Sequence, residues 1–229
     1  MERERNFDSP IPSTFDKYRE AIYFLRMMIE TYHFPDEFQF NLNAFIQSLR
    51  NITFMLQSEE NKPPTFDEWY ALKRDEMGAS DLLIKFRDGR NLIVKKQMLK
   101  RKSVAVVGYF QYRSCKSALK VNVSPLLDSV SILEKAQQLF TGFLIDERHI
   151  FEWEQLGVER TWIYDELDDG EIVSLCCQAL NFMGELVSQA HSLYGVALEP
   201  YICDPNIDHV RVLLETDVDP SLAEKWGWE

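Results

Sequence analysis

Hydrophobic residues recur at three- and four-residue steps through most of the first hundred residues, which is the spacing of amphipathic helices. Ser13 or Thr14 can cap a first helix that ends near Pro35, and a second helix begins at Asp36. The second helix has an apolar stripe too wide to be exposed, so we expect it at the centre of a bundle. The stripe consists of Phe38, Leu42, Phe45, Ile46, Leu49, Ile52, Phe54 and Leu56.

Two more helices are predicted before residue 100. Thr65 and Glu68 have the spacing of a capping box, which predicts that a third helix begins there. Ser80 or Asp81 can cap a fourth helix, which contains Gly89. A glycine inside a helix costs about 1 kcal/mol relative to alanine. Packing must therefore compensate for Gly89, or the helix starts again at that position.

The character of the chain changes after residue 102. Residues 104–112 and 119–123 are rich in β-branched and aromatic side chains, and the short stretch between them, 113–117, is polar. This pattern is typical of two strands joined by a turn. It predicts a β-hairpin over residues 103–125.

Residues 126–229 are predicted to add helices and short strands that complete the core. They comprise a helix from Leu126 to about Ile145 that buries Leu133, Ala136, Leu139 and Phe140, a strand Arg160–Tyr164, a helix from Asp168 or Asp169 to Tyr194, and a strand Val210–Leu214. No linker rich in Gly, Ser or Pro divides the chain. We therefore predict a single, mainly α domain over residues 1–229, with its bundle segment at 36–102.

Charge and composition narrow the class of protein. The 229 residues include 25 Lys and Arg against 37 Asp and Glu, a net charge of −12, which excludes a uniformly basic nucleic-acid binder. No window reaches 18 apolar residues, and the start of the chain lacks the apolar stretch of a secretion signal. We therefore expect a cytoplasmic protein without a membrane partner.

The residues that usually hold metals or cofactors do not form a known pattern. The four cysteines lack the paired spacing of a zinc site and are interpreted as reduced thiols, and the four histidines lie far apart. Glycine-rich phosphate loops, dinucleotide-binding turns and nucleophile elbows are missing from the sequence. The sequence therefore predicts no metal and no cofactor.

One segment departs from the acidic average. Residues 85–102 contain eight basic side chains and a single acid, Asp88. Such a cluster can attract a phosphate backbone, although a solvated helix end with the same charges is the simpler interpretation. The basic residues are Lys85, Arg87, Arg90, Lys95, Lys96, Lys100, Arg101 and Lys102.

The order of parts between residues 36 and 100 resembles a known family. A long apolar helix, an aromatic helix start and a basic helix follow one another as Leu42–Arg50, Phe66–Tyr70 and Asp81–Lys95. Together they resemble the HEPN-like group of prokaryotic helical-bundle proteins, and Arg90 followed by Asn91 is the most specific element. The resemblance implies an up-and-down helical bundle, homodimerisation, and a toxin–antitoxin or phage-defence setting.

Active members of that group are metal-independent ribonucleases with an arginine, four to six intervening residues and then a histidine. This sequence has Lys95, Lys96 and Gln97 where the histidine is expected. Histidine can transfer protons near neutral pH because its pKa is about 6.5, whereas that of lysine is about 10.4. We therefore expect a non-catalytic homodimer that binds a protein or RNA partner.

Two alternatives stay open. The first is a ribonuclease that uses Arg90 with Lys95 or Lys96, and the second is a small-molecule or nucleotide-binding module. The residues predicted to bind RNA or a partner are Arg90, Asn91, Lys95, Lys96, Lys100, Arg101 and Lys102.

Overall fold

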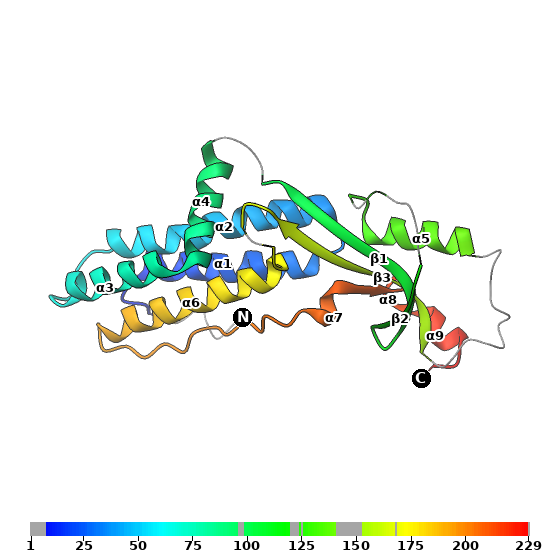
Figure 1. The fold of residues 1–229 in the computed structure, drawn as a ribbon. Helices are drawn as coiled ribbons and strands as arrows, with labels where there is room; N and C mark the ends of the chain where they lie inside the picture. Colours follow the sequence, from blue (N-terminus) through cyan, green and yellow to red (C-terminus); the bar gives the residue numbers. More distant parts are fainter. Residues whose placement is uncertain are drawn as a thin grey trace.

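A helical bundle forms one end of the molecule and a twisted β-sheet forms the other (Figure 1). The computed structural model describes residues 8–95, 99–119, 124, 126–140, 153–167 and 169–228. The five long helices on the bundle side are α1 (Pro12–Glu30), α2 (Pro35–Ser58), α3 (Phe66–Ala79), α4 (Asp81–Lys95) and α6 (Ile172–Ser192).

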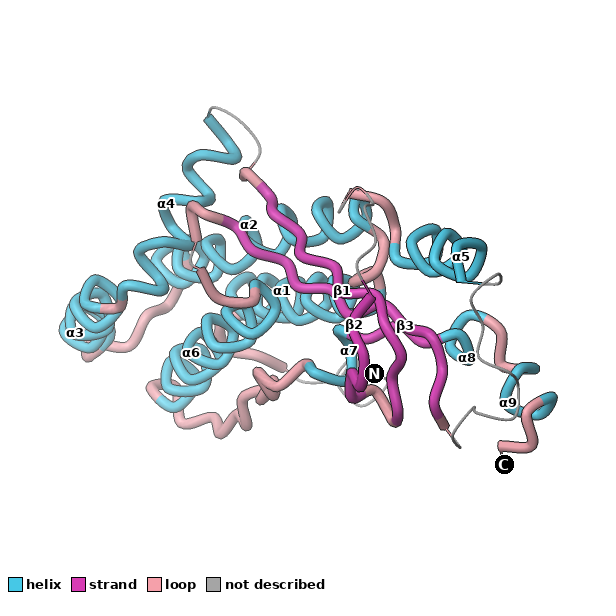
Figure 2. The backbone as a smooth tube through the Cα atoms, turned by 45° about the vertical axis from the view of Figure 1, so that its right-hand side comes forward, coloured by secondary structure: helices cyan, strands magenta, loops and turns pink. Residues whose placement is uncertain are grey.

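The sheet has four antiparallel strands in the order β2-β1-β3-β4. Figure 2 shows β1, β2 and β3 in magenta beside the helices of the bundle. Its two long central strands pair along their whole length, from Arg101 opposite Tyr164 to Gln111 opposite Glu154. The strands are β1 (Arg101–Gln111), β2 (Ser114–Leu119), β3 (Glu154–Tyr164) and β4 (Val212–Leu214). One further helix and three short ones flank the sheet: α5 (Ser129–Phe140), α7 (Asp208–Arg211), α8 (Glu215–Val218) and α9 (Ser221–Lys225).

The core of the bundle continues into the inner end of β3. Trp162 stacks on Phe38 of α2 with ring centroids 5.2 Å apart, and its indole N–H donates to the carbonyl oxygen of Tyr32 over 2.9 Å. The Tyr164 hydroxyl donates to Gln39 Oε1 over 3.0 Å. These buried contacts fix the position of the sheet against the bundle, because polar groups inside a protein are costly without partners.

The helical pattern of the sequence predicted the bundle helices well, but three predicted caps are wrong. Ser13 and Thr14 lie inside α1, which begins at Pro12 and has Ile11 at its N-cap position. Thr65 has a helical backbone and makes no capping hydrogen bond. Helix α6 is capped by Glu171, whose carboxylate accepts from the Ser174 N–H over 2.9 Å, instead of by Asp169. Asp168, the other predicted cap, lies outside the described residues.

The second half of the chain differs more from the prediction. The hairpin is present as β1 and β2, but β2 occupies Ser114–Leu119, so most of the stretch 113–117 that was predicted to be the turn is strand. Strand β3 is longer than predicted and begins at Glu154 instead of Arg160. Helix α5 starts only at Ser129, where Asp128 accepts from the Ser131 N–H over 2.7 Å. The fold is therefore mainly helical but includes a four-stranded sheet. This is more β-structure than the predicted hairpin and short strands.

Three other expectations can be compared with the structure. Leu139 was predicted to be buried and is 58% exposed, while Ile145 lies outside the described residues. Cys177 was interpreted as a free thiol, but a disulfide joins it to Cys203. Within the described ranges, no helix combines the length and the apolar character that a membrane crossing requires.

Candidate functional site

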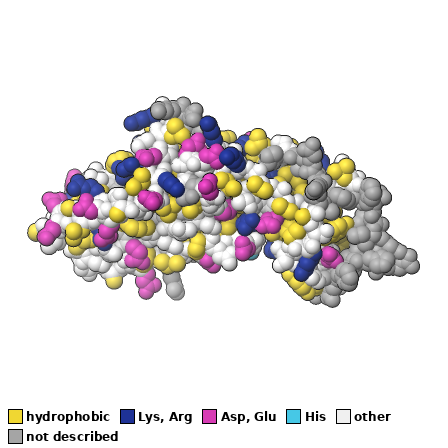
Figure 3. Space-filling view, viewed as in Figure 1, with side chains coloured by type: hydrophobic (Ala, Val, Ile, Leu, Met, Phe, Trp, Pro, Cys, Tyr) yellow, Lys and Arg dark blue, Asp and Glu magenta, His cyan; other side chains and the backbone are white. Residues whose placement is uncertain are grey.

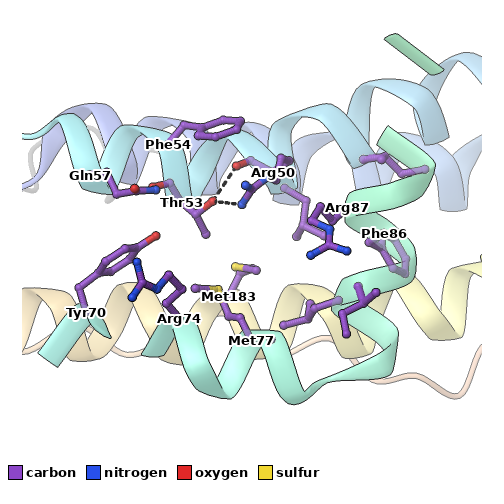
Figure 4. Close-up of a pocket in the computed structure, with 15 residues that line it drawn as sticks. Arg50, Thr53, Phe54, Gln57, Tyr70, Arg74, Met77, Phe86, Arg87 and Met183 are labelled. Atoms are coloured by element: carbon purple, nitrogen blue, oxygen red, sulfur yellow. Dashed lines mark hydrogen bonds between the residues drawn. The ribbon is translucent and has the colours of Figure 1, made fainter. Parts of the chain in front are cut away.

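A cavity of about 310 Å³ lies between α2, α3 and α4, and Met183 of α6 contributes to its wall (Figure 4). Its position follows from the helical register, because residues three or four apart on each helix face the same neighbour. Most of the wall is apolar. The apolar lining residues are Ile46, Leu49, Phe54, Met77, Leu83, Ile84, Phe86 and Met183.

Three arginines from three helices line this cavity: Arg50 from α2, Arg74 from α3 and Arg87 from α4 (Figure 4). Arg50 Nη1 donates to Thr53 Oγ1, one turn further along the helix, over 2.7 Å. The lining residues include no Asp, Glu, His or Cys, the side chains that hold most metal ions in proteins. The described lining therefore suits an anion and not a cation.

Burial and neighbouring charges act on the pKa of Arg50 in the pocket wall. Burial lowers the pKa of Arg50, and the neighbouring positive charges of Arg87 and Arg90 lower this pKa further, while Tyr70 acts in the opposite direction. Burial also raises the pKa of Tyr70, so its hydroxyl stays neutral. A bound anion would relieve the repulsion among the arginines, because opposite charges favour the charged form.

Only one of the lining arginines has an acidic partner among the described residues. Arg87 Nε lies 2.9 Å from a carboxylate oxygen of Asp88, and both side chains are exposed. Neither Arg50 nor Arg74 forms an ion pair within the part of the chain that the structure describes. The pocket therefore carries positive charge that the described protein does not neutralise.

Arg90, the central residue of the predicted site, lies beside this pocket. Its guanidinium carbon is 5.9 Å from the centroid of the Phe54 ring, which belongs to the pocket wall. Its Nη1 is 3.5 Å from Asn91 Oδ1, and its Nε is buried without a hydrogen-bond partner among the described residues. A buried donor of this kind is unusual, because nearly all such groups are paired.

The other predicted binding residues are not gathered at the pocket. Lys95 is exposed at the end of α4, and Lys96 lies outside the described residues. The Lys100 N–H donates to the Glu166 carboxylate over 3.1 Å. At the start of β1, Arg101 pairs with Asp36 at 3.1 Å, and Lys102 pairs with Asp165 at 2.7 Å.

The basic segment 85–102 is therefore divided between two places. In its helical part, Arg87 lines the pocket and Arg90 lies beside it, whereas Arg101 and Lys102 are paired with acids. The space-filling view shows acidic and basic side chains interspersed over α4 and the start of β1 (Figure 3). A single continuous basic surface is not seen on this face.

The prediction from sequence missed Arg50, Arg74 and Tyr70. A signal for them exists: arginine and an aromatic residue recur four positions apart, a spacing that brings side chains together on a helix. The three pairs are Arg50 with Phe54, Tyr70 with Arg74, and Phe86 with Arg90. The spacing alone does not show that the pairs belong to one pocket, because this depends on how three helices pack.

The fold and the pocket define a mixed helical and β-sheet protein with a cation-lined cavity in its bundle. Residues 8–217 match the family model described as bacteriophage lambda protein ea47. The chain belongs to this family. It is 25% identical over 167 residues to Protein ea47 of Escherichia phage lambda, covering 69% of this chain and 38% of that protein.

The chain thus spans well under half the length of this curated relative. No solved structure matches the chain. These findings correct the resemblance to HEPN-like proteins, because the family match extends over nearly the whole chain and points to the phage family. The resemblance rested on the order of helices and on Arg90 with Asn91, and amphipathic helices in this order are common to many bundles.

Proposed function

We propose that this phage-family chain is a binding protein without a reaction of its own, and that its arginine-lined pocket holds an anionic, partly apolar ligand. One observation carries the proposal: Arg50, Arg74 and Arg87 line a mainly apolar cavity whose described lining contains no carboxylate. Charge-assisted hydrogen bonds from guanidinium groups are strong in such surroundings. Few polar groups in an apolar wall are also typical of small-molecule sites.

The absence of reaction chemistry is inferred from the same lining residues. General acids and bases need a proton affinity near the working pH, and His, Asp, Glu and Cys supply most of them. Thr53 and Tyr70 are the hydroxyl-bearing residues of the described lining. The Thr53 hydroxyl donates to the Arg50 carbonyl oxygen over 3.0 Å, and burial raises the pKa of Tyr70. Neither group is placed to act as a base at neutral pH.

An aromatic sulfonate tests the binding proposal, because it combines one anion with flat apolar rings. We expect 8-anilinonaphthalene-1-sulfonate to bind with saturation at one site per chain and to bind more weakly as salt rises. Arg50→Met and Arg74→Met should each weaken binding about tenfold, as expected for the loss of one charge-assisted hydrogen bond. The matched control is Arg19→Met, because Arg19 is a partly exposed arginine of α1 that pairs with Asp16.

If Arg50→Met and Arg74→Met bind the probe as tightly as Arg19→Met and the native protein do, the probe binds elsewhere and the pocket is rejected as its site. Thermal unfolding of each variant checks that the fold is kept. The second part of the proposal is tested by incubating the protein with RNA and nucleoside triphosphates and analysing the mixture by mass spectrometry. Products that form with the native protein and disappear with Arg87→Met would overturn the non-catalytic assignment.

A further inference from the structure

We infer that the ligand is a nucleotide, with its base against the apolar wall and its phosphates among the arginines. This inference rests on the proposed function, and it adds the chemical class of the ligand. A free nucleotide and a single nucleotide of a single-stranded chain share this chemistry. Four features of the described residues support the inference. They match the phosphates, the face of the base, the edge of the base and the size of the whole ligand.

The first feature is the amount of positive charge. Arg50 and Arg74 line the cavity without an ion pair among the described residues, Arg87 lines it while paired with Asp88, and Arg90 adds a further guanidinium beside Phe54. A monocarboxylate would neutralise only one of these charges. Phosphate groups carry more charge and accept two parallel hydrogen bonds from one guanidinium, so they match the cluster better.

The second feature is a flat surface of the kind on which bases stack. Phe54 is 39% exposed, and the guanidinium carbon of Arg50 lies 4.3 Å from the centroid of its ring. Aromatic rings and arginine planes are the usual stacking partners of nucleobases. An aliphatic anion would make no use of this arrangement.

The third feature is polar groups that can recognise the edge of a base. Gln57 and Tyr70 lie in the same lining. The Gln57 side chain donates one amide hydrogen to the Thr53 carbonyl oxygen over 2.9 Å, which orients the amide. Its remaining groups and the neutral Tyr70 hydroxyl offer both donors and acceptors, as a heteroaromatic ring requires.

The fourth feature is size. The cavity of about 310 Å³ is near the lower end of the range for small-molecule sites, about 300–1,000 Å³. It therefore suits a single nucleotide unit, whereas a duplex would have to contact a long basic surface. The mixture of acidic and basic side chains over α4 does not provide such a surface on the face shown (Figure 3).

Competition against the fluorescent nucleotide N-methylanthraniloyl-ADP tests the inference. We expect ADP to displace the probe at a concentration at least about tenfold lower than either adenosine or pyrophosphate, because only ADP carries both parts. A single-stranded tetranucleotide with a 5′-phosphate forms the second arm. The stronger of these two competitors shows whether the pocket binds a free nucleotide or a nucleotide of a single strand. Either result supports a nucleotide-binding pocket.

Two variants connect the result to the pocket. Phe54→Leu should weaken ADP binding several-fold, about the effect of losing one stacking contact. Phe40→Leu is the matched control on the same helix, since Phe40 is 64% exposed and does not line the cavity. Arg74→Gln should also weaken binding about tenfold, with Arg19→Gln as its control.

The inference and the proposed function fail in different ways. Pyrophosphate that competes as well as ADP, together with an unchanged Phe54→Leu variant, would show a plain polyanion site and overturn the nucleotide assignment alone. The aromatic sulfonate would then still bind through Arg50 and Arg74. Lack of binding by the nucleotides, the tetranucleotide and the sulfonate would overturn both proposals.

Discussion

His33 and Ser129 meet in the buried joint between the bundle and the sheet, where His33 Nδ1 lies 2.9 Å from Ser129 Oγ. The His33 Nε2 lies 2.9 Å from the carbonyl oxygen of Val210, and the Ser129 hydroxyl also accepts from Arg160 Nε over 3.0 Å. His33 therefore connects the loop before α2 with α5 and with α7. The ring fits this position as a neutral group, because an adjacent guanidinium opposes a second positive charge.

The first prediction concerns pH. Burial lowers the pKa of His33 from 6.5 to about 4, so the unfolded chain binds this proton more tightly than the folded protein. The contribution of His33 to stability is thus complete above about pH 6.5 and is lost as the pH falls towards 4. It amounts to about 3 kcal/mol. Urea unfolding at several pH values should show this loss between pH 6.5 and 4.

The charged and titratable groups that act on His33 are Arg160, Asp217 and Arg113. His33→Gln keeps a donor near Val210 but does not titrate, so its stability should depend less steeply on pH in the same window. His209→Gln is the control, because His209 is exposed on α7. If His33→Gln and the native protein have the same pH slope, His33 is not the group responsible.

The second prediction concerns Tyr32 and Glu171. The Tyr32 hydroxyl lies 3.1 Å from Glu171 Oε1 and 3.0 Å from the carbonyl oxygen of Arg160. Tyr32→Phe removes this donor beside a partly buried carboxylate, whose pKa is already raised by burial. Leaving a buried polar group without its partner costs about 1–3 kcal/mol.

Chemical unfolding should therefore show Tyr32→Phe destabilised by that amount near neutral pH. Tyr23→Phe provides the comparison, since Tyr23 lies on α1, the helix just before the turn that holds Tyr32, and is 55% exposed, so this variant should unfold like the native protein. Equal stability of the two variants would mean that Glu171 is satisfied without Tyr32.

Sequence patterns predicted the elements that depend on local interactions better than those that depend on contacts between distant parts of the chain. Helical periodicity and turn residues act locally, and they placed α1, α2, α3 and α4 within a few residues of their observed bounds. Strand β3 was predicted too short because its first half contains Gln155, Gly157 and Glu159, which disfavour a strand. Pairing with β1 over its whole length overrides that preference.

The candidate site could be predicted only in part from the sequence, because it too depends on contacts between residues that are distant in the chain. The charge cluster pointed to α4, where Arg87 does line the pocket and Arg90 lies beside it. Arg101 and Lys102 belong to the same cluster, yet they pair with Asp36 and Asp165, which are distant in sequence. A count of charges along the chain cannot show such pairing, because it depends on the arrangement of β1 beside the bundle.

The third prediction uses two glycines with opposite surroundings. A Cβ added to Gly89 in α4 would lie 2.7 Å from Leu167 Cδ2, whereas nothing lies within 4 Å of a Cβ added to Gly78 in α3. Helix α4 continues through Gly89, so close packing on Leu167 explains why a glycine is used there. Gly78→Ala should gain about 0.5–1 kcal/mol through helix propensity and reduced unfolded-state entropy.

Gly89→Ala gains the same propensity but overpacks the core, which costs about 1–3 kcal/mol, so a net loss of about 1 kcal/mol is expected. Thermal unfolding of both variants under one set of conditions compares them directly. Stabilisation by Gly89→Ala would show that Leu167 moves aside freely and that packing does not select glycine at this position.

The fourth prediction separates two neighbouring basic residues at the start of β1. Arg101 Nη1 donates to the carbonyl oxygen of Pro35 over 2.6 Å, at the start of α2, and its side chain is mostly buried. Arg101→Gln should therefore cost about 1–2 kcal/mol, because that carbonyl loses a charged donor. Lys102→Gln should leave the free energy of unfolding unchanged, since its ion pair with Asp165 is exposed. Urea unfolding at low and high salt measures both effects, and equal losses for the two variants would contradict the structural role assigned to Arg101.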